Sequence, residues 1–159
     1  MVVRRVGGEE WEQARELRLR ALADTPAAFL STLEDEQRLG EADWRARVSS
    51  ADGAWFVDVT DDGRFAGMVV VAFLSDDRGL ASLLGMWVER DRRRKGVGKR
   101  LVDHAVDAAR AAGATRVELE VNETLGPAVA LYRSCGFAPT GRRRQLPSGD
   151  QAVQMIRDV

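Results

Sequence analysis

Hydrophobic residues recur along the chain with two different periods, and the period divides the chain into segments. Between residues 9 and 24 they return every three or four positions among arginines and glutamates, which predicts an amphipathic helix that ends before Pro26. A second stretch with helical spacing runs roughly from residue 33 to 48. Ahead of both, the short apolar run at 2–6 predicts a first strand, closed by the glycine pair at 7–8.

In the middle of the chain the pattern changes to short apolar runs separated by turn-forming residues. The runs at 54–59, 64–74 and 80–88 are separated by the sequences TDDG and DDRG, which predict tight turns and therefore a meander of three strands. From Leu83 to Val88 the third run is apolar on both faces. This is expected of a strand in the middle of a sheet that is covered on both sides.

The last third of the chain predicts a helix, a strand and a closing hairpin. A helix from about residue 97 to 112 has one continuous apolar face and ends at Gly113. The residues predicted to be buried on this face are Val97, Leu101, Val102, Ala105, Val106 and Ala109. A strand at 115–121 follows, and a strand–helix–strand unit of this length predicts parallel strands. A short helix at about 127–134 precedes two strands within 137–146 and 151–159.

Together these segments predict one α/β domain over residues 1–159, with an α+β mixed sheet of about seven strands flanked by four helices. The chain carries 24 basic and 25 acidic residues for a net charge of −1, which argues against a general nucleic-acid-binding protein. Any site for an anion must therefore be local.

Cysteine usage and hydropathy bear on the expected location of the protein. Cys135 is the only cysteine, so an internal disulfide framework is excluded and a reducing, cytoplasmic location is expected. The first residues lack the apolar core of a signal peptide, and no apolar run approaches the roughly 18 residues of a membrane span, so no membrane association is expected. His104, the only histidine, has no second ligand to suggest a metal, and none is expected.

The loop between the third strand of the meander and the following helix combines glycines with basic residues. Helix N-termini expose unpaired backbone N–H groups and bind phosphate, and Gly96 and Gly98 let that backbone approach a ligand closely. The basic residues around the same point are Arg93, Arg94, Lys95, Lys99 and Arg100. This loop is the predicted anion site.

Two known phosphate-binding patterns fit this loop poorly. A Walker loop needs a serine or threonine after Gly-Lys, and Arg100 stands there instead, so this pattern is excluded. A dinucleotide-binding pattern has Leu101 at its third glycine position, although Glu118 lies where a ribose-binding acid is expected. A dinucleotide-binding oxidoreductase therefore remains an alternative.

A third pattern fits better. The spacing Arg93-x-x-Gly96-x-Gly98, after an apolar strand and at the start of an amphipathic helix, resembles the pyrophosphate-binding signature of the GNAT superfamily of N-acetyltransferases. The later segment GPAVALYRSCGF, residues 126–137, resembles another motif of the family, and the order of elements is also the GNAT order along essentially the whole chain. The resemblance implies a GNAT fold and transfer of acetyl from acetyl-CoA directly to a primary amine in a ternary complex, without a metal.

The same resemblance implies roles for particular residues. The backbone at Met86, Trp87 and Val88 would hold the pantetheine arm and polarise the thioester carbonyl. The pyrophosphate would be bound by Arg93 and by the amides of Arg94, Lys95, Gly96, Val97, Gly98 and Lys99. Tyr132 matches the tyrosine that protonates the leaving thiolate.

The general base and the acceptor site are implied less directly. Glu120 matches the proposed base of the ribosomal-protein N-terminal acetyltransferases of the superfamily, also in its spacing to Tyr132. The alternative for Glu118 and Glu120 is the solvated face of a strand. Phe29, after the break at Pro26, is expected to line the acceptor site.

One departure and several open points remain. Leu125 stands where the family commonly has an asparagine that bonds the cofactor arm, which keeps a catalytically silent acyl-CoA-binding or regulatory module as an alternative. The acceptor is a small-molecule or peptide primary amine of a kind that the sequence does not specify: a protein N-terminus, a lysine, a polyamine, an amino acid or an aminoglycoside. The oligomeric state is open, and only analogy with relatives suggests a homodimer.

Overall fold

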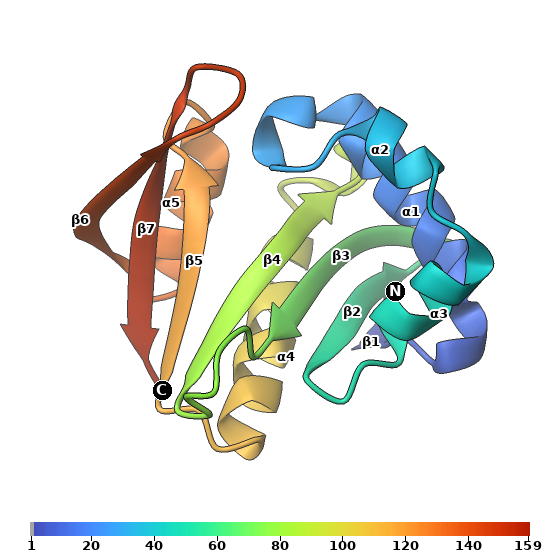
Figure 1. Ribbon diagram of the computed structural model, residues 1–159, viewed down its shortest axis with the longest axis horizontal. Coiled ribbons are helices and arrows are strands. Elements are labelled where there is room, and N and C mark those ends of the chain that lie inside the picture. Colours follow the sequence, from blue (N-terminus) through green and yellow to red (C-terminus); the bar gives the residue numbers. More distant parts are fainter. Residues whose placement is uncertain (1) are drawn as a thin grey trace.

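The computed structural model describes residues 2–159 and contains a seven-stranded sheet with the order β1-β2-β3-β4-β5-β7-β6 (Figure 1). The strands are β1 (Val2–Arg5), β2 (Gly53–Val59), β3 (Phe65–Ala72), β4 (Leu80–Val88), β5 (Arg116–Asn122), β6 (Ala138–Gln145) and β7 (Gln151–Asp158). β4 and β5 are parallel, and every other neighbouring pair is antiparallel. The predicted mixed sheet and the three-stranded meander are confirmed.

Five α-helices occur in the described chain, rather than the four expected. They are α1 (Trp11–Asp24), α2 (Leu33–Gln37), α3 (Glu41–Val48), α4 (Val97–Ala111) and α5 (Gly126–Ser134), with short 3-10 turns at Gly8–Glu10, Pro26–Ala28 and Arg90–Arg92. The single helix expected at 33–48 is wrong, because Gly40 interrupts it in an extended conformation. The Gly40 N–H donates to Asp43 at 3.0 Å, which starts α3 as a new helix.

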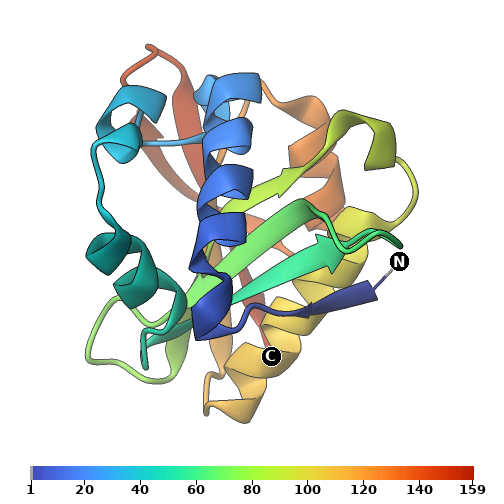
Figure 2. The same ribbon diagram turned by 90° about the vertical axis from the view of Figure 1, so that its right-hand side faces the viewer.

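The helices cover both faces of the sheet. α1 crosses one face and α4 lies against the other, as Figure 2 shows. All six residues of the predicted apolar face of α4 are buried. These six residues belong to a hydrophobic core between α4 and the centre of the sheet, which also includes Tyr132. A second core on the opposite face contains Trp44, Trp55 and Trp87 together with residues of α1. No helix within residues 2–159 has the length and hydropathy to cross a membrane.

β4 and β5 separate soon after they begin. They pair only from Leu80, opposite Arg116, to Ser82, opposite Glu118, and then diverge (Figure 1). The register between β3 and β4 also shifts between Met68 and Val70. The shift lies at Gly85, which has a φ of +61°, so the bulge needs a glycine.

This divergence corrects the expectation that residues 83–88 are covered on both sides. Leu84, beyond the last residue of β4 that pairs with β5, is 41% exposed. The backbone of β4 beyond Ser82 therefore has a strand partner on the β3 side alone. An opening of this kind in mid-sheet leaves hydrogen-bonding groups free for a ligand.

Candidate active site

The loop before α4 is held by two arginines, Arg92 and Arg93, of which Arg93 was expected from the sequence to bind an anion. Arg92 donates from Nη2 to Asp58 at 3.0 Å, and Asp58 is fully buried on β2. Arg93 donates from Nε to the Val88 carbonyl at 2.7 Å and from Nη2 to Asp24 at 2.9 Å. The guanidinium groups of both residues are thus engaged within the protein and fix the loop against β2, β4 and the end of α1.

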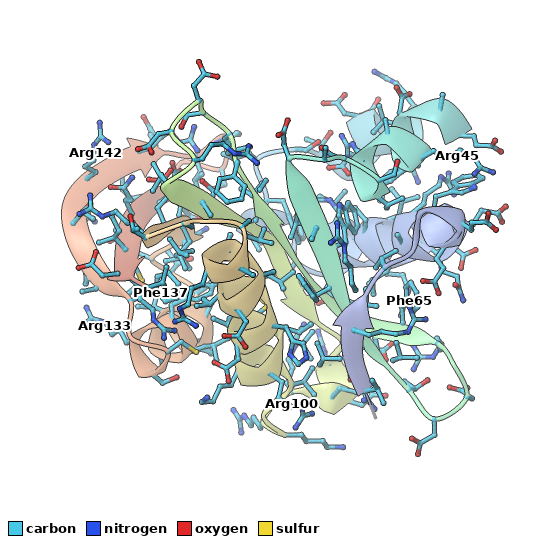
Figure 3. All side chains as sticks on the ribbon, turned by 90° about the horizontal axis from the view of Figure 1, so that it is seen from below. Arg45, Phe65, Arg100, Arg133, Phe137 and Arg142 are labelled. Atoms are coloured by element: carbon cyan, nitrogen blue, oxygen red, sulfur yellow. The ribbon has the colours of Figure 1, made fainter. Side chains whose placement is uncertain are left out.

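The start of α4 presents the predicted anion site. Gly96 has a φ of +79° at the N-cap, and the first bond of the helix runs from the Arg100 N–H to the Gly96 carbonyl at 3.1 Å. The amides of residues 97–99 therefore have no helical acceptor. Arg100 lies on the outer side of this end of α4 (Figure 3).

The basic residues of this loop that remain available for an anion are Arg94 and Lys95. Both are exposed, and neither forms an ion pair with a residue of the described chain. Lys99 instead pairs with Asp103 at 2.8 Å. Arg94 is also the one non-glycine residue between positions 2 and 159 with a positive φ, 62°. Its strained backbone turns the chain toward α4, which supports an oriented set of amides for an anion.

Gly98 has a packing role that spacing alone does not show. A Cβ on Gly98 would lie 2.9 Å from Cδ2 of Leu131 on α5. The absence of a side chain therefore allows α4 and α5 to approach each other. This adds to the predicted role of Gly98 in ligand approach.

Tyr132 lies on α5, in the core on the α4 side of the sheet, and its ring packs edge-on against Phe137 with 6.1 Å between ring centres. Its hydroxyl makes no hydrogen bond to another residue of the described chain, yet it is not among the fully enclosed polar atoms. Burial raises the pKa of Tyr132 well above its ordinary range. The phenol therefore stays protonated at neutral pH and has a free proton to donate.

Glu120 lies on the other face of β5, because Leu119 and Val121 on either side of it join the α4-side core. It is exposed, and its Oε2 accepts from Arg144 Nε at 3.0 Å. Oε1 has no partner within residues 2–159. Glu118 is half-buried and accepts from Ser82 at 3.2 Å and from Gln154 at 3.1 Å, so its oxygens stabilise the point where β4 and β5 diverge.

Two hollows lie on this face of the sheet, beside β5, β7 and β6. One has a volume of about 560 Å³ and is bounded in part by Glu118, Arg142 and Gln154. The other, of about 270 Å³, is bounded by Glu120, Arg142, Arg143, Arg144, Ala152 and Gln154. Figure 3 shows Arg142 at the edge of the molecule, on strand β6. Space for an acceptor therefore exists beside Glu120.

The sequence suggested Phe29 for the acceptor site and gave no indication of Arg18, which the structure places in contact with Phe29. The Arg18 guanidinium stacks on the Phe29 ring at 4.6 Å and binds the buried Glu36 through two hydrogen bonds of 3.0 Å. Its Nη1 also lies beside the β4 bulge, 2.9 Å from where a Cβ on Gly85 would be. A positive-φ glycine within a strand was the available signal for close packing here, although it does not identify the partner.

The segment around Leu125 is occupied by contacts within the protein. The Asn122 side chain donates to the Ala27 carbonyl at 3.0 Å and to Asp150 at 2.9 Å, and it also accepts from Thr124. Asn122 is thus committed to joining β5 to the turn after α1. Leu125 itself is the N-cap of α5.

Other chemistries find little support in the described residues. No group of three or more histidine, cysteine or acidic side chains within 2–159 is arranged to hold a metal ion. A dinucleotide-binding fold needs a largely parallel sheet, whereas this sheet has a single parallel pair. The oxidoreductase alternative is therefore wrong.

Comparison with known proteins agrees with this geometry. Residues 11–137 match the acetyltransferase (GNAT) family. The ribosomal protein bS18-alanine N-acetyltransferase of Escherichia coli (strain K12) is 30% identical over 131 residues, which cover 80% of this chain and 84% of that protein. Streptothricin acetyltransferase of Streptomyces lavendulae is 36% identical over 104 residues, 65% of this chain and 54% of that one.

Among solved structures, a GNAT-family acetyltransferase from Streptococcus pneumoniae superposes over 99% of both chains with a TM-score of 0.82 at 19% identity. The fold of the whole described chain is thus that of a GNAT enzyme. With the family match and the diverging strands β4 and β5, the chain belongs to the GNAT family and is an acetyl-CoA-dependent N-acetyltransferase.

Proposed function

We propose that this chain binds acetyl-CoA through the opening between β4 and β5 and transfers the acetyl group directly to a primary amine that enters from the α1–α2 face. The observation that carries this proposal is the early divergence of β4 and β5, after Ser82 and Glu118, next to the N-terminus of α4. The residues present fit the donor. The free amides at the start of α4, with Arg94 and Lys95, suit a pyrophosphate, and the backbone of residues 86–88 suits an amide-bearing arm.

Tyr132 and Glu120 lie on opposite faces of the sheet, which suits a direct transfer. The amine nitrogen attacks the thioester carbonyl carbon and forms a C–N bond, and the resulting tetrahedral intermediate then collapses with cleavage of the C–S bond. Glu120, directly or through water, takes the proton that the amine loses, and Tyr132 gives a proton to the departing thiolate. Backbone N–H groups of β4 stabilise the negative oxygen between these events.

A covalent acetyl-enzyme is not part of the proposal. Cys135, the only thiol of the chain, is 7% exposed, and burial raises its pKa. A buried neutral thiol is a poor nucleophile. The amine itself is therefore the group that attacks the thioester.

The acceptor class is a primary amine, either a small molecule or the amino group of a peptide. The relatives support both kinds, since one is named for acetylation of alanine in a ribosomal protein and another for acetylation of streptothricin.

Calorimetric titration with acetyl-CoA, with NAD and NADP in parallel, tests the donor. We expect acetyl-CoA to bind with a micromolar or lower Kd and the nicotinamide cofactors not to bind. Gly96→Ala should weaken binding at least about tenfold, because an alanine opposes the positive φ that orients the amides. The matched control is Gly113→Ala, which strains a positive φ of 101° at the opposite end of the same helix.

Thiol release in the presence of an amine panel then tests the transfer. Amine-dependent thiol release supports the enzyme. Tight binding of acetyl-CoA with no transfer to any amine of the panel would overturn the proposed acceptor class. Absence of acetyl-CoA binding would overturn the proposed donor site.

A further inference from the structure

Arg18 is held beside the bulge of β4 by a buried cluster of charges. Its Nε and Nη2 each donate to Glu36 at 3.0 Å, and Glu36 is only 1% exposed. Arg47 donates to the same carboxylate at 3.0 Å. Phe29 stacks on the face of the Arg18 guanidinium. Because one edge and one face of the guanidinium are engaged, both its position and its plane are fixed.

The other edge of this guanidinium is unused. Arg18 Nη1 makes no hydrogen bond to any residue that the structure describes. Trp44 Nε1 is the one fully enclosed side-chain nitrogen or oxygen without a partner in residues 2–159, so Arg18 Nη1 remains open to solvent. It lies at the bulge, 2.9 Å from the position of a Cβ on Gly85. A fixed N–H donor without a partner, beside the strand proposed to hold the thioester, suits an oxygen of the acceptor.

The acceptor would meet opposite charges on the two sides of the opening. Arg18 lies on the β4 side, whereas Glu120 lies on the same face of β5 with one oxygen free. A ligand that suits both residues needs an amine for Glu120 and an oxygen for Arg18. An α-amino acyl unit carries both groups, with three bonds between the amine nitrogen and the carbonyl oxygen. Leu84, 41% exposed, and Leu30, 53% exposed, are apolar residues next to Gly85 and Phe29 that suit an aliphatic side chain.

We propose that Arg18 is a specificity-determining residue, whose Nη1 donates a hydrogen bond to the carbonyl or carboxylate oxygen next to the acceptor amine. The acceptor is then an α-amino acyl compound, either a free amino acid or the first residue of a peptide. This inference rests on the proposed acetyl transfer and narrows its acceptor. Amines that lack such an oxygen, polyamines among them, leave Arg18 Nη1 without a partner and gain nothing from it.

The test compares two acceptors that differ by one carboxamide: leucinamide and 3-methylbutylamine. The wild-type protein should use leucinamide with a kcat/KM at least about tenfold higher. Arg18→Lys retains a cation for Glu36 but loses the free guanidinium edge, so the ratio of the two kcat/KM values should fall toward one. Leucine and a leucyl-glycine dipeptide, measured in parallel, distinguish the two sources: a preference for leucine indicates a free amino acid, and a preference for the dipeptide a peptide N-terminus.

Arg47→Lys is the matched control. It changes the same charge cluster, because Arg47 also binds Glu36, but the Arg47 guanidinium stacks on Trp44 rather than facing β4. The acceptor ratio should stay at the wild-type value in this variant. If Arg18→Lys does not fold, the double variant R18M/E36Q, which removes both charges of the pair, serves for the same comparison.

The outcomes separate this inference from the proposed function. Equal use of both amines by the wild type, or a ratio that Arg18→Lys leaves unchanged, overturns the role of Arg18 and leaves acetyl transfer standing. Binding of acetyl-CoA without acetylation of leucinamide, leucine or the dipeptide overturns the α-amino acyl acceptor. Failure to bind acetyl-CoA overturns the proposed function itself.

Discussion

The carboxylate of Asp24 accepts a hydrogen bond of 2.9 Å from Arg93, and this contact joins the end of α1 to the loop before α4. The Arg93 side chain also donates to the carbonyl of Val88, the last residue of β4, at 2.7 Å. The same carboxylate accepts from the Trp87 indole at 3.1 Å. The side chain of Asp24 thus connects α1, strand β4 at its opening toward β5, and the loop of the proposed anion site.

Replacement of Asp24 by alanine should destabilise the protein and loosen the donor site. The Nε1 of the buried Trp87 would lose its acceptor, so the free energy of unfolding should fall by about 1–3 kcal/mol. Acetyl-CoA should bind more weakly, because Arg93 would no longer hold the loop. Urea denaturation and calorimetry measure the two effects. Asp91→Ala, which removes an exposed carboxylate from the same loop, is the control and should change neither.

The destabilisation caused by Asp24→Ala should depend on pH. Hydrogen bonds, first from Thr25 and then from Trp87, lower the pKa of Asp24 from 3.8 to about 2. A pKa that is lower in the folded state adds stability above the unfolded value, and this stability is lost as the pH falls from about 4 toward 2. The difference in unfolding free energy between the wild type and Asp24→Ala should therefore be full at pH 6 and shrink below pH 4. A constant difference down to pH 2.5 would contradict this assignment.

Tyr132→Phe should lower the rate of acetyl transfer by about 10²-fold and leave the affinity for acetyl-CoA nearly unchanged. The hydroxyl lacks any partner within residues 2–159, so its loss leaves the fold intact, whereas the thiolate loses its proton donor. Burial raises the pKa of Tyr132, so the wild-type rate should show no loss from ionisation of this phenol up to about pH 10. Single-turnover rates across pH measure both effects. An unchanged turnover number would remove the proposed role.

The parts of the fold that the sequence predicted well are those encoded by local periodicity. The bounds of β4 and the buried face of α4 follow from residues close in sequence, because burial on one face imposes a repeat. The break at Gly40 was missed because a single glycine inside a helical pattern costs only about 1 kcal/mol and is often tolerated. Its extended conformation depends on the local cap with Asp43.

The parts of the site that the sequence did not reveal depend on contacts between distant residues. Arg93 was expected to bind phosphate, yet its side chain is bonded to Asp24, 69 positions away, and the neighbouring Arg92 is bonded to Asp58, 34 positions away. Arg18 gives no signal of its own, since its place is set by Glu36 on α2 and by the bulge of β4. The motif indicates where the anion site is expected, and long-range ion pairs decide which cations remain available there.

Glu120→Gln should lower kcat/KM for the amine by about 10²-fold at neutral pH, because an amide cannot accept the amine proton. Binding of acetyl-CoA should not change, since Glu120 faces away from the α4 side. Arg144→Gln is the control: it breaks the ion pair with Glu120 but leaves the carboxylate in place. A similar loss in both variants would mean that the ion pair, rather than proton transfer, accounts for the effect.

The contact between Gly98 and Leu131 predicts coupling between α4 and α5. Gly98→Ala places a Cβ 2.9 Å from the end of the Leu131 side chain, so it should lower the unfolding free energy by about 1 kcal/mol. In a Leu131→Ala background the collision is absent, and the same change should be neutral or stabilising, because alanine favours a helix over glycine. Urea denaturation of the four proteins gives the coupling energy, which should be about 1 kcal/mol. Additive effects would show that Gly98 does not set the approach of the two helices, and a fall in acetyl-CoA affinity in both backgrounds would assign the missing side chain to the ligand as well.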